Sequence, residues 1–125
     1  MNIRVNSFNE LENRCLEFSL NVKSFCSTVK QDIIHQDCIL QVIRSSAALG
    51  ANFIEANEKL GENNLIHKMK IARKESKETL YWLHHFDESD ERDFLLDEAD
   101  QLRKILSSII SKLSLNNTQT NNYTN

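Results

Sequence analysis

Apolar residues recur along this chain at intervals of three and four positions, which is the spacing of one face of an α-helix. In the first such stretch the two intervals alternate strictly, at Phe8, Leu11, Cys15, Phe18, Val22, Phe25 and Val29. Ser7 precedes the stretch and Glu10 follows three positions later, a capping-box pattern that predicts a helix start. The polar run 30–32 interrupts the pattern, so the first helix is predicted to end near Val29.

A second helix is predicted over residues 38 to 56. Of the seven residues 45–51, five are serine or alanine, and such small side chains let another helix approach closely. Gly50 lies inside this stretch although glycine costs a helix up to about 1 kcal/mol relative to alanine. Because the apolar period continues to Phe53, Gly50 indicates a packing role rather than a helix end. Gly61 opens the clearest break and is predicted to lie just past the end of this helix.

Two further apolar stripes predict a third and a fourth helix. The third stripe consists of Leu65, Met69, Ala72, Ser76, Leu80, Leu83 and Phe86. The fourth consists of Leu95, Leu102, Leu106, Ile109 and Leu113. The acidic run 87–91 is predicted to form the turn between them. We therefore predict an all-α protein, an antiparallel up-down-up-down four-helix bundle over residues 7–115, with an N-terminal arm at 1–6 and a disordered Asn/Thr-rich tail at 116–125.

Composition narrows the class of protein further. The chain has 125 residues, two glycines and no proline, which nearly excludes an all-β fold, because tight turns and barrel corners rely on those two residues. No apolar run approaches the roughly 20 residues of a membrane span, and no signal-peptide pattern stands at the N-terminus. These absences predict a cytoplasmic protein without a membrane partner.

The residues that usually carry catalysis are not arranged for it. The three cysteines lack C-x-x-C spacing and are predicted to be reduced, buried, small hydrophobic side chains. No Glu-x-x-His occurs, although a di-metal bundle needs two, and two glycines are too few for a phosphate-binding loop. His67, His84 and His85 have no nucleophile partner and are predicted to lie on the surface. We therefore expect no enzyme, no cofactor and no metal.

Two motifs resemble those of a known family. Residues 41–56 read QVIRSSAALGANFIEA, close to the pattern Q-L-x-R-S-x-x-S-x-x-x-N-x-x-E-A/G of a bacterial family first noticed in intervening sequences of 23S rRNA genes. Residues 68–83 resemble that family's A/E-x-x-E-x-x-Y-W-L pattern, and the resemblance covers roughly residues 7–114.

That resemblance implies a left-handed four-helix bundle that forms a homo-oligomer, typically a pentamer. The accessory variability proteins of diversity-generating retroelements look like distant relatives, and those bind nucleic acid and a reverse transcriptase through a strongly basic surface. This chain, with a net charge of −3, departs from that property.

Several of the matched residues are polar and flank the core stripes of the second and third helices. They are Gln41, Arg44, Ser45, Asn52, Glu55, Glu75, Glu78 and Trp82. An unpaired buried polar group costs roughly 1–3 kcal/mol, so these residues are predicted to form a hydrogen-bonded network that fixes helix register or a subunit contact. A ligand or catalytic site built from them is the alternative.

Charge is uneven along the chain, with a net of +4 over residues 59–77 and −7 over residues 87–100. The basic part predicts a face that contacts RNA or DNA, and repetition of that face around a ring would strengthen binding by avidity. Its residues are Lys68, Lys70, Arg73, Lys74, Lys77 and Tyr81. The alternative is a solvated helix face, with the acidic residues placed at a helix N-terminus where the dipole favours them.

We therefore predict a non-enzymatic homo-oligomeric binding or scaffold protein that contacts RNA or DNA. The alternative function is a protein-partner adaptor or a purely structural oligomer with no nucleic-acid binding.

Overall fold

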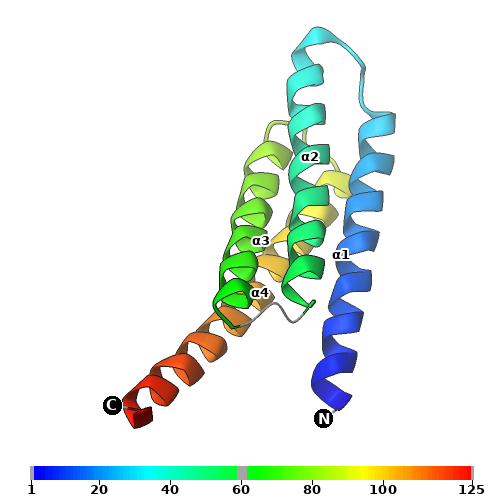
Figure 1. The fold of residues 1–125 in the computed structure, drawn as a ribbon. Coiled ribbons are helices and arrows are strands. Elements are labelled where there is room, and N and C mark those ends of the chain that lie inside the picture. The colour runs from blue at the N-terminus through cyan, green and yellow to red at the C-terminus, as the bar shows by residue number, and fades with distance from the viewer. Residues whose placement is uncertain (1, 59–61, 125) are drawn as a thin grey trace.

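The computed structural model describes the backbone of residues 2–58 and 62–124, and the side chains of residues 8–58 and 64–115. Within these residues the chain forms four helices and no strand: α1 (Asn2–Thr28), α2 (Ile33–Ala56), α3 (Glu62–Leu83) and α4 (Asp90–Thr124). Consecutive helices run in opposite directions, and both chain ends lie at the same end of the bundle (Figure 1). The predicted all-α four-helix fold is confirmed.

Two helices begin with side-chain caps. The Asp32 carboxylate accepts a hydrogen bond from the backbone N–H of His35 at 3.0 Å at the start of α2. Hydrogen bonds from His35 lower the pKa of Asp32. At the start of α4, Ser89 Oγ accepts from the backbone N–H of Arg92 at 3.1 Å, and three acidic residues occupy the first helical turn. Part of the predicted acidic turn therefore belongs to the first turn of α4, where the helix dipole favours negative side chains.

The outer helices extend past their predicted ends. The predicted helix start at Ser7 is wrong, since α1 begins at Asn2, and α4 continues beyond Leu115 to Thr124. No proline or glycine lies within either helix to break its backbone hydrogen bonds. The interpretation of residues 1–6 as an arm and 116–125 as a disordered tail stays a prediction, because all their side chains lie outside the described residues. Gly61 also lies outside them.

The core confirms the predicted stripe of α1 and corrects two others. Every predicted α1 position is buried or packs against the core. In α3 Thr79 is fully buried at the place in the stripe where Leu80 was predicted, and Leu80 itself is half-buried. In α4 the burial moves from Leu106 to Ile110, and Ile109 is only partly buried. Residues seven positions apart do not lie exactly above one another on a helix with 3.6 residues per turn. Residues 95, 102 and 109 therefore move gradually around α4 and away from the core.

Gly50 has the predicted packing role. A Cβ atom placed at Gly50 would lie 3.3 Å from the Cβ atom of Cys15, which is tighter than ordinary contact. Residue 50 of α2 therefore packs directly against residue 15 of α1, and this contact fixes the level at which the two helices lie side by side.

All three cysteines are free and buried, as predicted. Burial raises the pKa of Cys15 to about 12 and that of Cys26 to about 11. Both thiols therefore stay protonated at neutral pH, a state in which a thiol is a poor nucleophile.

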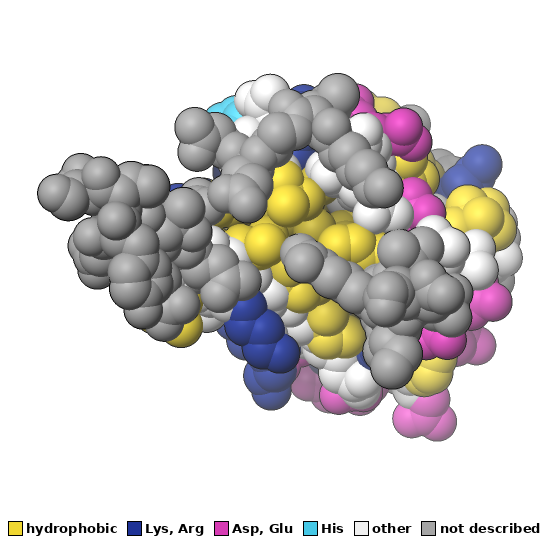
Figure 2. All heavy atoms as spheres, turned by 60° about the horizontal axis from the view of Figure 1, so that its bottom comes forward, with side chains coloured by type: hydrophobic (Ala, Val, Ile, Leu, Met, Phe, Trp, Pro, Cys, Tyr) yellow, Lys and Arg dark blue, Asp and Glu magenta, His cyan; other side chains and the backbone are white. Residues whose placement is uncertain are grey.

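The four helices pack unevenly around the bundle. Each contacts its two neighbours; α2 and α3 pack most extensively and α1 and α4 least. A pocket of about 360 Å³ opens between α1 and α4 near the end that carries both termini, with Phe8, Leu11, Ile105 and Ile109 among its lining. Figure 2 shows apolar side chains at the centre of this end of the molecule. The α1–α4 seam is therefore the least closed side of the bundle.

Candidate functional site

Arg44 stands at the centre of a polar cluster on the seam between α2 and α3. Its guanidinium forms an ion pair with Glu78, lies 3.6 Å from Glu75 Oε1, and donates from Nε to Gln41 Oε1 at 3.4 Å. The structure thus brings together four of the eight polar residues singled out in the two motifs. The other four make separate contacts.

Glu75 is the buried member of this cluster, with 7% of its surface exposed. Its Oε1 has no hydrogen-bond partner among the described residues. Arg44 is the only cation within ion-pair distance of this carboxylate in the described part of the chain. Because a buried charge needs a counter-charge, Arg44 is the residue that makes the burial of Glu75 tolerable.

A second polar contact crosses the same seam deeper in the bundle. Thr79 Oγ1 donates to the Glu75 carbonyl oxygen at 2.8 Å and lies 2.9 Å from Ser45 Oγ, and both hydroxyls are fully buried. This pair explains why α3 buries Thr79 in place of Leu80: the hydroxyl finds a partner on α2.

The remaining motif residues lie apart from Arg44. Asn52 Nδ2 donates to the Ala48 carbonyl oxygen of its own helix at 2.8 Å, and Glu55 pairs with Lys68 of α3 at 2.7 Å. Trp82 is half-buried, and its ring centroid lies 5.0 Å from that of Tyr81. The seam therefore holds several short contacts between α2 and α3 rather than one continuous network.

Only four of the six residues predicted to form the basic face of α3 lie on one exposed stripe. Lys70, Lys74, Lys77 and Tyr81 are all exposed, and their spacing of four, three and four places them on one outward stripe. In the described part of the chain, none of these three lysines forms an ion pair. We call these four residues the lysine stripe.

The other two basic residues turn toward neighbouring helices. Lys68 pairs with Glu55 of α2, and Arg73 reaches toward Ser107 of α4 at 3.5 Å. At the opposite end of the lysine stripe, the rings of Tyr81 and His85 lie 4.7 Å apart between centroids. Sequence reasoning assigned His85 only to the surface, although its i, i+4 spacing from Tyr81 places the two rings together.

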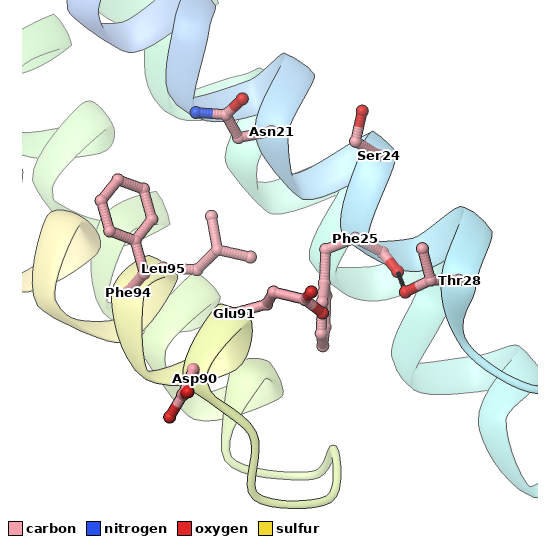
Figure 3. Close-up of a pocket in the computed structure, with 8 residues that line it drawn as sticks. All are labelled: Asn21, Ser24, Phe25, Thr28, Asp90, Glu91, Phe94 and Leu95. Atoms are coloured by element: carbon pink, nitrogen blue, oxygen red, sulfur yellow. Dashed lines mark hydrogen bonds between the residues drawn. The ribbon is translucent and has the colours of Figure 1, made fainter.

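A pocket between α1 and α4 was not predicted. It has a volume of about 470 Å³ and combines aromatic, aliphatic and acidic side chains. Its lining consists of Asn21, Ser24, Phe25, Thr28, Asp90, Glu91, Phe94 and Leu95 (Figure 3). Phe94 is 63% exposed. We call this the acidic-rimmed pocket; the sequence pattern missed it because its two walls, on α1 and α4, come from distant parts of the sequence.

Neither a metal-binding cluster nor a membrane-spanning helix occurs among the described residues. No three His, Cys, Asp or Glu side chains there lie close enough together to hold a metal ion. Within the same residues, none of the helices has the length and apolar character needed to cross a membrane.

The fold of this chain is similar to that of a protein whose structure has been solved. The chain superimposes with a TM-score of 0.73 on a protein of unknown function from the S23 ribosomal protein family of Bacteroides thetaiotaomicron. The two sequences are 26% identical, and the match covers 83% of this chain and 97% of the other. This chain is similar to the S23 family. The predicted resemblance is thereby confirmed.

The S23 likeness rests on the solved structure. No protein-family model matches this chain, and neither does any curated protein. The predicted distant similarity to accessory variability proteins stays a prediction. Both motif stretches that carry the S23 resemblance lie in α2 and α3, the two helices that pack most extensively.

Proposed function

We propose that this S23-like chain is a non-enzymatic, homo-oligomeric binding protein that contacts the backbone of RNA or DNA through the lysine stripe of α3. The single observation that carries the proposal is the outward alignment of Lys70, Lys74 and Lys77 without an ion pair in the described part of the chain. Unpaired ammonium groups on one face are available to phosphate oxygens, and Tyr81 adds a ring on which a base can stack.

Oligomerisation matters to this proposal because one stripe is short. Three lysines reach about three phosphates, and the net charge of −3 opposes the approach of a polyanion. Several copies that present the same stripe to one strand convert later contacts into intramolecular ones, which raises the overall affinity without any new contact. A homo-oligomer, a pentamer by resemblance, would therefore bind where a single protomer would not.

Reversal of the stripe is the direct experiment. The triple variant Lys70→Glu, Lys74→Glu, Lys77→Glu should lose at least about tenfold in affinity for a single-stranded RNA, because each lost phosphate contact also removes its share of counterion release. The wild-type affinity should fall with salt at a logarithmic slope of about −2 per stripe. Fluorescence anisotropy with a labelled oligonucleotide measures both quantities.

The matched control carries the same change in charge at other sites. Lys30, Lys104 and Lys112 are exposed and lie outside α3, so their replacement by glutamate should leave affinity within a few-fold of the wild type. An equal loss of affinity in both triple variants would show that net charge alone causes the effect, and it would contradict a specific role for the lysine stripe. Absence of salt-sensitive binding by the wild-type protein would refute nucleic-acid binding itself.

The acidic-rimmed pocket favours a second candidate function, that of a protein-partner adaptor. A half-open apolar site with Phe94 exposed and Asp90 and Glu91 at its edge suits a partner segment with an apolar anchor and flanking basic residues. A host protein that co-purifies with the wild type and is lost from a Phe94→Glu variant would support this function. A host protein that still co-purifies with the Phe94→Glu variant would show that the acidic-rimmed pocket does not bind it.

A further inference from the structure

Three aromatic rings lie together where α3 ends. The ring centroid of Tyr81 lies 5.0 Å from that of Trp82 and 4.7 Å from that of His85, and the Trp82 and His85 centroids are 5.0 Å apart. Each ring therefore contacts the other two, and we call these three residues the ring cluster. Lys77 precedes Tyr81 by four positions, so the ring cluster continues the lysine stripe at one end.

Local contacts hold the ring cluster in place. His85 Nδ1 donates to the Tyr81 carbonyl oxygen at 2.9 Å, since a carbonyl oxygen can only accept. That carbonyl group lies in the last turn of α3, where a helix leaves its carbonyl oxygens without a donor. Trp82 is half-buried, so its ring is anchored against the bundle. Because the rings are already ordered, a ligand that packs on them loses little binding free energy to conformational entropy.

Tyr81 is the member of the ring cluster that is open to a ligand. Its side chain is 59% exposed, and its hydroxyl group forms no hydrogen bond in the described part of the chain. Burial of an aromatic ring is favourable, and rings prefer to pack on other flat π-systems. An ordered ring that remains in water is therefore available to stack on a planar group of a ligand.

The charges on either side of the ring cluster favour a base there and oppose a phosphate. The lysine stripe precedes the rings, and the acidic run 87–91 follows them along the chain. The four carboxylates of that run form no ion pair among the described residues. Glu78, which is nearer to the rings, is paired with Arg44. Phosphate groups are thus attracted to the lysines and repelled beyond the rings, so the rings can receive the uncharged part of a nucleotide.

We propose that the ring cluster stacks on an unpaired base of a single-stranded nucleic acid and adds affinity that only a single strand can use. The inference rests on the nucleic-acid role in the proposed function and names the form of nucleic acid that the site takes. A ring stacks on the face of a base, and in a duplex those faces are covered by the neighbouring base pairs. The lysine stripe alone would bind both forms, because both present phosphates.

The variant Tyr81→Ala separates stacking from phosphate binding. It should lose about tenfold in affinity for a labelled single-stranded oligonucleotide, and it should stay within about twofold of the wild type for a blunt duplex of the same sequence. Fluorescence anisotropy measures both affinities. Tyr81→Phe keeps the ring and should bind both forms as the wild type does. The matched control is Phe94→Ala, because Phe94 is 63% exposed on α4, outside the ring cluster, and its loss should change neither affinity.

Trp82 supplies an independent signal of stacking. It is the only tryptophan of the chain, and its ring contacts both Tyr81 and His85. A base stacked on the ring cluster should therefore quench the fluorescence of Trp82. A duplex held by the lysines alone should leave that fluorescence unchanged at the same degree of saturation.

The outcomes distinguish this inference from the proposed function. A Tyr81→Ala protein that binds the single strand as tightly as the wild type, or that loses equal affinity for both forms, would overturn stacking on the ring cluster and leave the lysine stripe its role. A wild-type protein that binds neither form would overturn both. Helix content by circular dichroism should stay unchanged, since Tyr81 is exposed. If it falls, Tyr81→Leu repeats the test with a larger apolar side chain that has no ring.

Discussion

Replacement of Arg44 by alanine is expected to lower the free energy of unfolding by about 2 kcal/mol, because it leaves the buried Glu75 carboxylate without its counter-charge. The loss should fall below the 3–5 kcal/mol of a fully buried pair, since Arg44 is half exposed and water can enter when it is removed. Urea denaturation followed by circular dichroism measures the change.

Two further variants assign this loss to Glu75. Removal of the buried charge by Glu75→Gln in the Arg44→Ala background should recover a large part of the lost stability. Gln41→Ala, which removes only an exposed partner of Arg44, should stay within about 0.5 kcal/mol of the wild type. An Arg44→Ala protein as stable as the wild type would show that solvent alone accommodates Glu75.

Replacement of Gly50 by leucine is expected to cost about 2 kcal/mol of stability. The Cβ atom alone would lie 3.3 Å from Cys15, and the larger side chain has no space between the two helices. Overpacking of this kind costs about 1–3 kcal/mol, and the better helix propensity of leucine returns somewhat less than 1 kcal/mol. Thermal and urea unfolding of the variant measure the balance.

Gly50→Ala is the matched control for that variant. Alanine gains up to about 1 kcal/mol in helix propensity, while its methyl group requires Cys15 to move by a few tenths of an ångström, so the two effects should nearly cancel. A leucine variant as stable as the alanine variant would mean that α1 can move away from α2 at little cost.

Much of the fold follows from periodicity, and its failures have identifiable physical causes. The α1 stripe could be predicted because every core position there is apolar. The same reasoning failed at Thr79, a polar residue that is buried because Ser45 lies opposite on another helix. In α4 the error came from following a seven-residue spacing along a helix of 3.6 residues per turn, which moved the predicted core from Ile110 to Ile109.

The candidate sites, too, could be predicted only where they lie on a single helix. Spacing along α3 was sufficient to group Lys70, Lys74, Lys77 and Tyr81, because residues on one helix face are related by sequence alone. Spacing could not show that Lys68 contacts α2 and Arg73 contacts α4, since these contacts depend on the register between the helices. The pairing of Arg44 with Glu75 and Glu78 depends on that register too, and so does the acidic-rimmed pocket.

The uneven packing of the four helices also has a consequence for the order in which the native state opens. The α2–α3 pair is a hairpin of helices adjacent in sequence and holds the most extensive contact, so it forms a local cooperative unit that needs little loop-closure entropy. Helix α1 meets α4 across the least extensive contact and across the longest separation along the chain. Opening of the α1–α4 seam therefore breaks the least extensive of the four helix contacts, together with the Arg14–Glu98 ion pair, and it exposes the apolar lining of that seam while the α2–α3 hairpin stays intact.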